Sequence, residues 1–80
     1  MSGGQRRDQI VRRVLDTDGA RLFGRHLFAW MREKLELALS TGQRDLRILV
    51  RQQRLERSHD HNGESWYSPG PNWWKWEEVP

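Results

Sequence analysis

Tryptophan is concentrated near the C-terminal end of this 80-residue chain, where four of its five tryptophans fall within the last fifteen positions. Trp66, Trp73, Trp74 and Trp76 are interrupted by the proline-containing run 68–72. Each buried tryptophan removes roughly 150–250 Å² from water, so this segment needs a large apolar surface to pack against. That surface is the chain's own core, a second copy of the chain, a partner protein or nucleic-acid bases.

The rest of the chain offers little apolar material for a core. A domain of this length buries only about 60% of the surface that its unfolded chain exposes, and only 35% of the residues are hydrophobic. We therefore predict one domain, residues 1–80, in which at least two of Trp73, Trp74 and Trp76 dock on helices and complete the core. The alternative is that these three tryptophans are anchors for a partner protein.

Charge divides the chain into two unlike parts. Residues 1–57 contain 13 lysines and arginines against 7 acidic residues, whereas residues 58–80 contain 1 against 4. Arginine outnumbers lysine 12 to 2, which suits bidentate recognition of phosphate or carboxylate, although coding bias in a GC-rich genome gives the same ratio. The basic body is expected to meet phosphates or an acidic protein surface, and the acidic tail to avoid a phosphate backbone.

Several classes of protein are disfavoured by composition. The chain has no cysteine, so it has neither a disulfide framework nor a thiolate metal site. No apolar run approaches the roughly 20 residues that span a bilayer, and the first residues lack the apolar segment of a secretory signal. We expect a cytoplasmic protein with no membrane partner and no cofactor.

The N-terminal half has the apolar spacing of two helices. Residues 5–16 place Ile10, Val11 and Val14 on one face, after a frayed segment 1–4. A second helix is predicted over residues 20–40, with Gly42 just beyond its end as a C-terminal cap. Its apolar stripe serves the core or, alternatively, a homodimer, and it contains Phe23, Leu27, Trp30 and Met31.

The C-terminal half contains an ambiguous segment and a strong turn. Residues 44–57 fit either a strand or a helix, and their arginines, glutamines and leucines favour the helix. Asn62-Gly63 predicts a two-residue hairpin turn, which would place His59 opposite Trp66. The fold class is therefore α-rich α+β: about three helices, a short hairpin near Asn62-Gly63 and an aromatic tail packed on the helices. The basic helical body spans residues 5–57, and the acidic hairpin and tail span residues 58–80.

One short pattern resembles the turn of a helix-turn-helix. Ala38 and Gly42 are separated by three residues, and Ile48 follows six positions later. The resemblance implies that the small alanine allows two helices to approach, that the glycine makes the turn and that Ile48 anchors the second helix. It also implies that the Asn62-Gly63 hairpin lies where a winged variant carries its wing.

A second helix of this kind would project arginines that can neutralise phosphates and contact base edges. The predicted nucleic-acid-binding residues are Arg44, Arg47, Arg51 and Arg54. Secondary candidates on the preceding helix are Arg21, Arg25 and Arg32.

Catalytic and metal chemistry have weaker support. His59 and His61 are two residues apart, but zinc needs about four ligands and His26 is the only other histidine. A ribonuclease would need these histidines and Glu64 to converge in a cleft, and no motif fixes that geometry. We therefore predict no metal site, no catalytic residues and no enzymatic activity.

The sequence thus predicts a small non-enzymatic binding protein. The first interpretation is a nucleic-acid-binding regulator that uses its arginine-rich helix on DNA or RNA. The alternative is a phage-type inhibitor or accessory protein that blocks a host protein surface with its acidic, tryptophan-rich tail. An arginine helix free of the tail favours the first, and tail carboxylates paired with those arginines favour the second.

Overall fold

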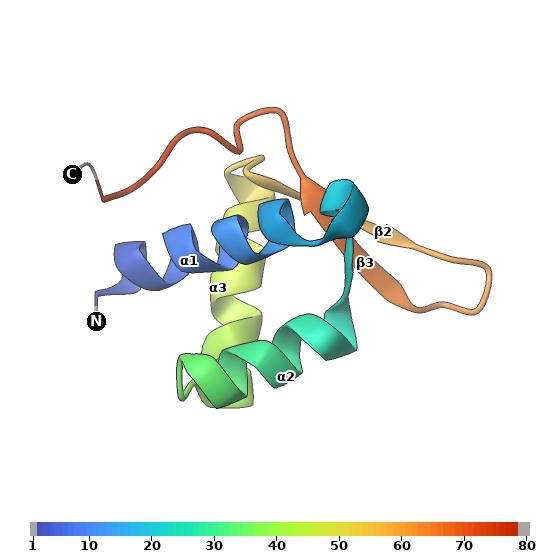
Figure 1. Cartoon of the computed structure of the whole chain (residues 1–80), viewed down its shortest axis with the longest axis horizontal. Helices are drawn as coiled ribbons and strands as arrows, with labels where there is room; N and C mark the ends of the chain where they lie inside the picture. The colour runs from blue at the N-terminus through green and yellow to red at the C-terminus, as the bar shows by residue number, and fades with distance from the viewer. Residues whose placement is uncertain (1, 79–80) are drawn as a thin grey trace.

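A computed structural model describes residues 2–78, which form three helices and a small antiparallel sheet (Figure 1). The α-helices are α1 (Gly3–Asp16), α2 (Gly24–Lys34) and α3 (Leu39–Arg51), and a short 3-10 turn covers Asp18–Ala20. The strands are β1 (Leu22–Phe23), β2 (Leu55–His59) and β3 (Ser65–Pro69). The predicted α+β class, with three helices and a C-terminal hairpin, is confirmed.

The sheet pairs a short strand from the N-terminal half of the chain with the C-terminal hairpin. Its order is β1-β3-β2, with β3 antiparallel to both neighbours. Leu22 pairs with Tyr67 in the short β1, and the hairpin register runs from Leu55 opposite Pro69 to His59 opposite Ser65. Along the chain, one helix is followed by one strand, two helices and a hairpin whose second strand lies in the middle of the sheet.

Helix α1 forms where its apolar spacing predicts. Ser2 and Gln5 make a capping box, in which the Ser2 hydroxyl accepts from the Gln5 N–H and the Gln5 side chain accepts from the Ser2 N–H. Ile10, Val11 and Val14 are buried, as the stripe requires. The predicted fraying is wrong for residues 2–4, which the capping box orders, and Met1 lies outside the described residues.

The single helix predicted over residues 20–40 is wrong, because the chain breaks it at both ends. Ala20 has a positive φ of 49°, and the next residues pair with β3 as strand β1, so α2 begins only at Gly24. The helix ends at Lys34, and Glu36 adopts a φ of 54° in the connection to α3. Gly42 does not cap α2; it lies inside α3.

The helix favoured for residues 44–57 is correct only as far as Arg51. Gln53 has a φ of 60°, which turns the chain out of the helix, and Leu55 starts strand β2. The first three residues of β2, Leu55, Glu56 and Arg57, are good helix formers, but the sheet ladder with β3 and the burial of Leu55 override that local preference.

The hairpin lies near Asn62-Gly63, but its loop is longer than predicted. His59 pairs with Ser65, so five residues connect the strands, and the expected pairing of His59 with Trp66 is wrong. The Asp60 carboxylate holds the loop by accepting the N–H groups of Asn62 and Glu64, and Gly63 supplies a φ of 80°.

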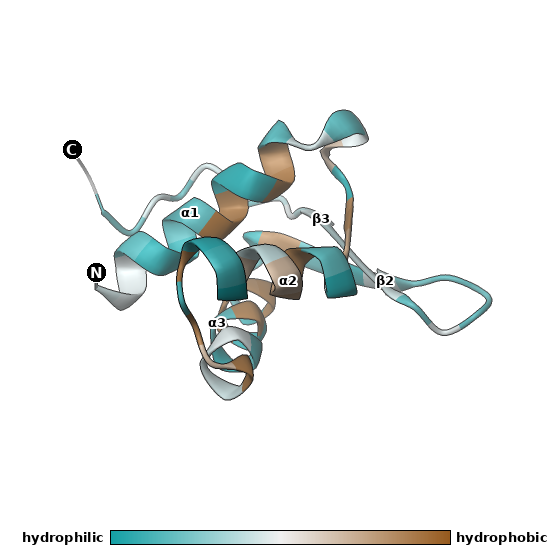
Figure 2. Ribbon diagram, turned by 60° about the horizontal axis from the view of Figure 1, so that its bottom comes forward, coloured by the Kyte–Doolittle hydropathy of each residue, from teal (hydrophilic) through white to brown (hydrophobic). Residues whose placement is uncertain are grey.

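The core lies between the three helices and the sheet (Figure 2). Its buried apolar residues are Ile10, Val11, Val14, Leu22, Leu27, Met31, Leu46, Leu49, Leu55 and Tyr67. Two members of the proposed dimer stripe, Leu27 and Met31, are therefore buried inside one chain, whereas Phe23 and Trp30 are partly exposed, and the homodimer through that stripe stays a prediction. None of the helices within residues 2–78 has the length and apolarity to cross a membrane.

Candidate nucleic-acid interface

Helix α3 has one buried face and one exposed, basic face. Asp45, Leu46 and Leu49 point into the protein. Arg44, Arg47 and Arg51 are all exposed, and their spacing of three and four residues places them along one side of the helix. Exposed Gln43 lies beside them, which adds an amide donor and acceptor to the same surface.

The basic face is free of acidic partners within residues 2–78. None of the ion pairs within residues 2–78 involves Arg44, Arg47 or Arg51. Their positive charge is therefore not neutralised by the described part of the protein. The predicted discriminator between nucleic acid and protein is thus only partly met, because the fourth predicted arginine, Arg54, pairs with the tail carboxylate Glu77.

Close packing against α2 holds α3 in place. A Cβ atom added to Gly42 would lie 2.9 Å from the Met31 Cε methyl and 3.5 Å from the Phe28 ring. Glycine therefore lets the first turns of α3 approach α2 closely. The helix-turn-helix resemblance places this small residue in the right part of the chain but gives it the wrong role, since the turn itself covers residues 35–38.

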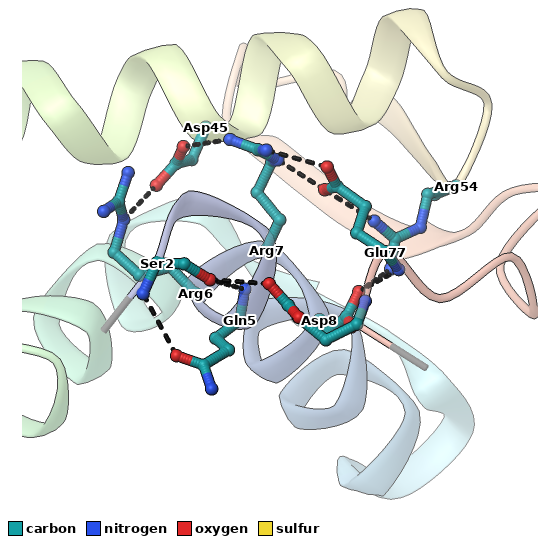
Figure 3. Close-up of polar contacts among 9 residues, drawn as sticks. Ser2, Gln5, Arg6, Arg7, Asp8, Asp45, Arg54 and Glu77 are labelled. Atoms are coloured by element: carbon teal, nitrogen blue, oxygen red, sulfur yellow. Dashed lines mark hydrogen bonds and ion pairs between the residues drawn. The ribbon is translucent and has the colours of Figure 1, made fainter. Parts of the chain in front are cut away.

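A buried carboxylate fixes the other side of α3. Asp45 is 1% exposed and accepts hydrogen bonds from Arg6 Nε at 3.0 Å and from Arg7 Nη1 at 3.2 Å. Both arginines belong to the first turns of α1, so these bonds fix α1 to the inner side of α3. Figure 3 shows Arg7 lying between Asp45 and the tail residue Glu77.

Arg54 does not belong to the exposed surface, and its prediction as a nucleic-acid contact is wrong. It follows the end of α3, is 2% exposed and points inward. Its Nη2 donates to Asp8 Oδ1 at 2.6 Å, and its Nη1 donates to Glu77 Oε2 at 3.1 Å (Figure 3). The positive φ of Gln53 turns the chain away from the helical path that would have exposed Arg54.

The tail is also bound directly to α1 and to its N-terminal cap residue. Asp8 accepts the backbone N–H groups of Glu77 and Glu78, both at 2.9 Å, while Arg7 Nη2 donates to Glu77 at 2.7 Å. Ser2 also donates its hydroxyl to Glu78 at 2.7 Å. The tail carboxylates are thus used inside the protein rather than against the α3 arginines.

The ionisation of this network follows from its contacts. Burial by itself would raise the pKa of Asp8, but the two tail N–H groups and the Arg54 guanidinium outweigh burial and hold the pKa below its ordinary value. The hydrogen bond from Arg7 is the largest cause of the lowered pKa of Glu77. Asp8 and Glu77 are therefore charged at neutral pH.

The tryptophans of the tail divide between core and surface. Trp76 is partly buried against the core and has the guanidinium of Arg12 4.9 Å from its ring centroid. Trp73 and Trp74 are 40% and 55% exposed. The prediction that at least two of these three dock on the helices is therefore wrong. Residues 71–74 form turns.

A groove of about 520 Å³ opens beside α3. Its apolar lining comes from Phe28 of α2, Leu46 and Val50 of α3 and Tyr67 of β3. Burial raises the pKa of Tyr67, so its hydroxyl stays protonated at neutral pH. The rim carries three guanidinium groups from three different elements: Arg25, Arg47 and Arg57.

The secondary arginine candidates lie outside α3 and differ in their contacts. Arg21 stacks over the Trp66 ring at 4.0 Å from its centroid. Arg25 forms an ion pair with Glu64 and lies over Phe23, whereas Arg32 is exposed. Sequence reasoning missed Arg57, which is exposed on β2 and donates to the Ser65 hydroxyl.

The histidines of the hairpin do not form a recognisable reactive centre. His59 lies near the end of β2 and His61 in the loop, and both are exposed. Within residues 2–78, no three side chains of histidine or acidic type lie close enough to hold a metal ion.

Comparisons with known proteins give no relative for this chain: no family model, no curated protein and no solved structure matches it.

Proposed function

We propose that this chain is a small DNA-binding regulator that places α3 in the major groove of a duplex. The observation that carries the proposal is the row of Arg44, Arg47 and Arg51 on the outer helix of a helix-turn-helix, exposed and without carboxylate partners in residues 2–78. Helices of this kind enter the major groove, whereas the surrounding elements contact the phosphate backbone.

The size and chemistry of α3 suit a B-form major groove. An α-helix with its side chains is about 10–12 Å wide, and the major groove is about 12 Å wide. Arginine donates two hydrogen bonds to guanine, and an amide such as that of Gln43 pairs with adenine in the same bidentate way. The deep, narrow major groove of A-form RNA does not admit such a helix, which is why DNA is preferred here.

Two further elements support a phosphate contact beside α3. Arg25 at the first turn of α2 and Arg57 on β2 flank the groove that Arg47 also lines. When α3 occupies the major groove, the backbone of one DNA strand would pass this rim before it reached the hairpin. Arg57 then neutralises a backbone phosphate, whereas Arg25 reaches one only by exchanging its ion pair with Glu64, and the hairpin loop 60–64 lies over the adjacent minor groove.

A second candidate function rests on the exposed tryptophans. Trp73 and Trp74 are apolar anchors of the kind that dominate protein interfaces, which favours a partner protein. The idea of an inhibitor with an acidic tail has less support, because Glu77 is committed to Arg7 and Arg54. The tail therefore offers aromatic surface rather than free carboxylates.

The test is DNA binding by matched pairs of arginine variants. Fluorescence anisotropy of a labelled duplex of random sequence is measured over a salt series. Arg44→Gln/Arg47→Gln is compared with Arg12→Gln/Arg13→Gln, which removes the same charge from exposed positions of α1. The α3 pair should lower the affinity and reduce the slope of log K against log salt by about 0.9 per lost phosphate contact.

The control pair should keep most of the wild-type slope. Equal losses for the two pairs would mean that only net charge matters, and no binding by the wild type at low salt would reject the proposed function. Competition by single-stranded DNA and by duplex RNA distinguishes duplex DNA from the other nucleic acids.

A further inference from the structure

A concave site with an apolar wall lies between α2, α3 and the hairpin. It is the groove of about 520 Å³ beside α3, a volume within the range of small-molecule sites. The rings of Phe23, Phe28 and Tyr67 line it, together with the aliphatic side chains of Leu46 and Val50. This wall favours a flat apolar ligand, because aromatic rings pack well against one another in offset or edge-to-face arrangements.

The charged residues of the groove leave it net positive. They are Arg25, Arg47, Arg57 and Glu64. Glu64 forms an ion pair with Arg25, so these two charges offset each other. Neither Arg47 nor Arg57 has an acidic partner within residues 2–78. Two guanidinium groups, one on α3 and one on β2, are therefore uncompensated, and they would attract an anion to the groove.

Arg57 is held at the rim with part of its guanidinium free. Its Nε and Nη2 donate to the Ser65 hydroxyl on β3 at 3.3 and 3.2 Å. Its Nη1 makes no hydrogen bond within residues 2–78. Because β3 already orients this side chain, less rotamer entropy is lost when Arg57 binds a carboxylate.

The Tyr67 hydroxyl is a second donor, and no group in residues 2–78 accepts a hydrogen bond from it. The residue is 5% exposed and lines the groove. A Cβ atom on Gly24 would lie 3.4 Å from the Tyr67 ring, so the first turn of α2 packs against this ring. A ligand oxygen in the groove would supply the acceptor that the phenol lacks.

The two donors lie on one face of the sheet. Arg57 is directly opposite Tyr67 in the antiparallel pair of β2 and β3, and side chains at opposite positions project together with their Cβ atoms about 5 Å apart. Burial raises the pKa of Tyr67 and outweighs the charge of Arg57, which lowers it. A neutral phenol and a guanidinium therefore stand side by side, and together they suit one carboxylate.

We propose that this groove binds a small aromatic carboxylic acid. Its carboxylate accepts hydrogen bonds from Arg57 and Tyr67, and its ring packs against Phe28 and Val50. Arg47 and Arg57 are also contacts of the proposed DNA complex, so the bound acid lowers the affinity for DNA, and DNA lowers the affinity for the acid by the same factor. The effect on DNA rests on the proposed function, whereas the binding of the acid does not.

Cinnamate is the probe, and its binding is followed by NMR of the ¹⁵N-labelled protein. Cinnamamide has the same ring without the charge, and acetate has the carboxylate without the ring. Cinnamate should produce saturable shifts at the groove residues of α2, α3 and β3. Cinnamamide should bind about tenfold or more weakly, because it loses a hydrogen bond between charged groups. Acetate should be weaker still than cinnamate by a similar factor, because it buries no ring.

Two variants test the two donors. Arg57→Gln should weaken cinnamate binding by about tenfold or more, and Tyr67→Phe, which removes only the hydroxyl, by about two- to tenfold. Arg13→Gln removes the same charge as Arg57→Gln from an exposed position of α1 outside the groove, and it should bind cinnamate as the wild type does. Circular dichroism verifies that every variant is folded.

Three results would overturn the proposal. Equal affinity for cinnamate and cinnamamide would show that the groove recognises apolar surface alone. Equal affinity for cinnamate and acetate would show that the rim attracts any anion. The absence of saturable shifts at the groove up to about 20 mM cinnamate would show that the acid does not bind, since a ligand of this size should reach a Kd in the low millimolar range.

The effect on DNA is measured by repeating the duplex titration with cinnamate or with the same concentration of sodium acetate, which matches the ionic strength. Cinnamate should lower the DNA affinity of the wild type relative to acetate, and it should do so less for Tyr67→Phe. A wild type that binds cinnamate but no duplex would reject the proposed function and sustain the ligand site. A wild type that binds both without mutual effect would overturn the coupling between them.

Discussion

Replacing Arg54 with methionine should destabilise the fold far more than the same replacement of an exposed arginine of α3. Arg54→Met leaves two carboxylates, Asp8 and Glu77, without the guanidinium that lies between them. Breaking a buried ion pair on one side costs about 3–5 kcal/mol. Asp8 keeps two backbone N–H donors and Glu77 keeps Arg7, so we expect the lower end, about 3 kcal/mol.

That loss is a large share of the total stability. A domain of 80 residues unfolds with a free energy of about 4–12 kcal/mol, and 3 kcal/mol corresponds to a fall of about 12–24 °C in melting temperature. Urea unfolding followed by circular dichroism measures the difference. Arg51→Met, the same change on the exposed face three residues earlier, is the matched control and should lie within about 0.5 kcal/mol of wild type.

A rescue variant separates charge from packing. If the cost of Arg54→Met comes from unpaired carboxylates, adding Asp8→Asn and Glu77→Gln should restore part of the lost stability, because a neutral site tolerates the methionine. Equal stabilities for Arg54→Met and Arg51→Met would refute the reasoning, since they would show that the buried network contributes nothing.

Three other predictions follow from the same contacts. The pKa values of Asp8 and Glu77 lie below their ordinary values, so their stabilising effect is complete above about pH 5 and is lost as the pH falls through the lower folded-state values. Urea unfolding over this range should show the loss, and Asp8→Asn/Glu77→Gln should flatten it. Gly70→Ala meets a backbone oxygen and should cost more than about 1 kcal/mol, whereas Gly42→Ala meets only a flexible methyl group and gains helix propensity, so its unfolding free energy should change little. Trp76→Ala should lower the unfolding free energy by about 2 kcal/mol, roughly half the cost at a fully buried site, and a neutral result would show that this residue does not belong to the core.

Apolar spacing was sufficient to place the elements whose contacts are mostly within one helix. The buried face of α1 follows from Ile10, Val11 and Val14, and the hairpin follows from Asn62-Gly63. The exposure of Arg44, Arg47 and Arg51 also follows from the resemblance to a helix-turn-helix. These features depend on local period and turn chemistry, which the sequence displays directly.

The errors occur where distant segments decide the structure. Leu22 leaves the expected helix because it pairs with Tyr67, which is 45 positions away. Arg54 is buried because Asp8 and Glu77, at opposite ends of the chain, meet at its side chain. Neither pairing has a local sequence signal. In the sequence, Arg54 resembles the exposed arginines of α3, and only the turn at Gln53 separates it from them.

The most direct test of the DNA-binding account is to map the contact surface by NMR. A ¹⁵N-labelled protein is titrated with an unlabelled duplex at moderate salt, and backbone amide and arginine Nε–Hε shifts are followed. The account predicts the largest changes at residues 43–51, smaller ones at Arg25 and Arg57, and none at the buried Arg54 guanidinium. Changes centred on Arg12 and Arg13, or on the tail at residues 73–78, would contradict it.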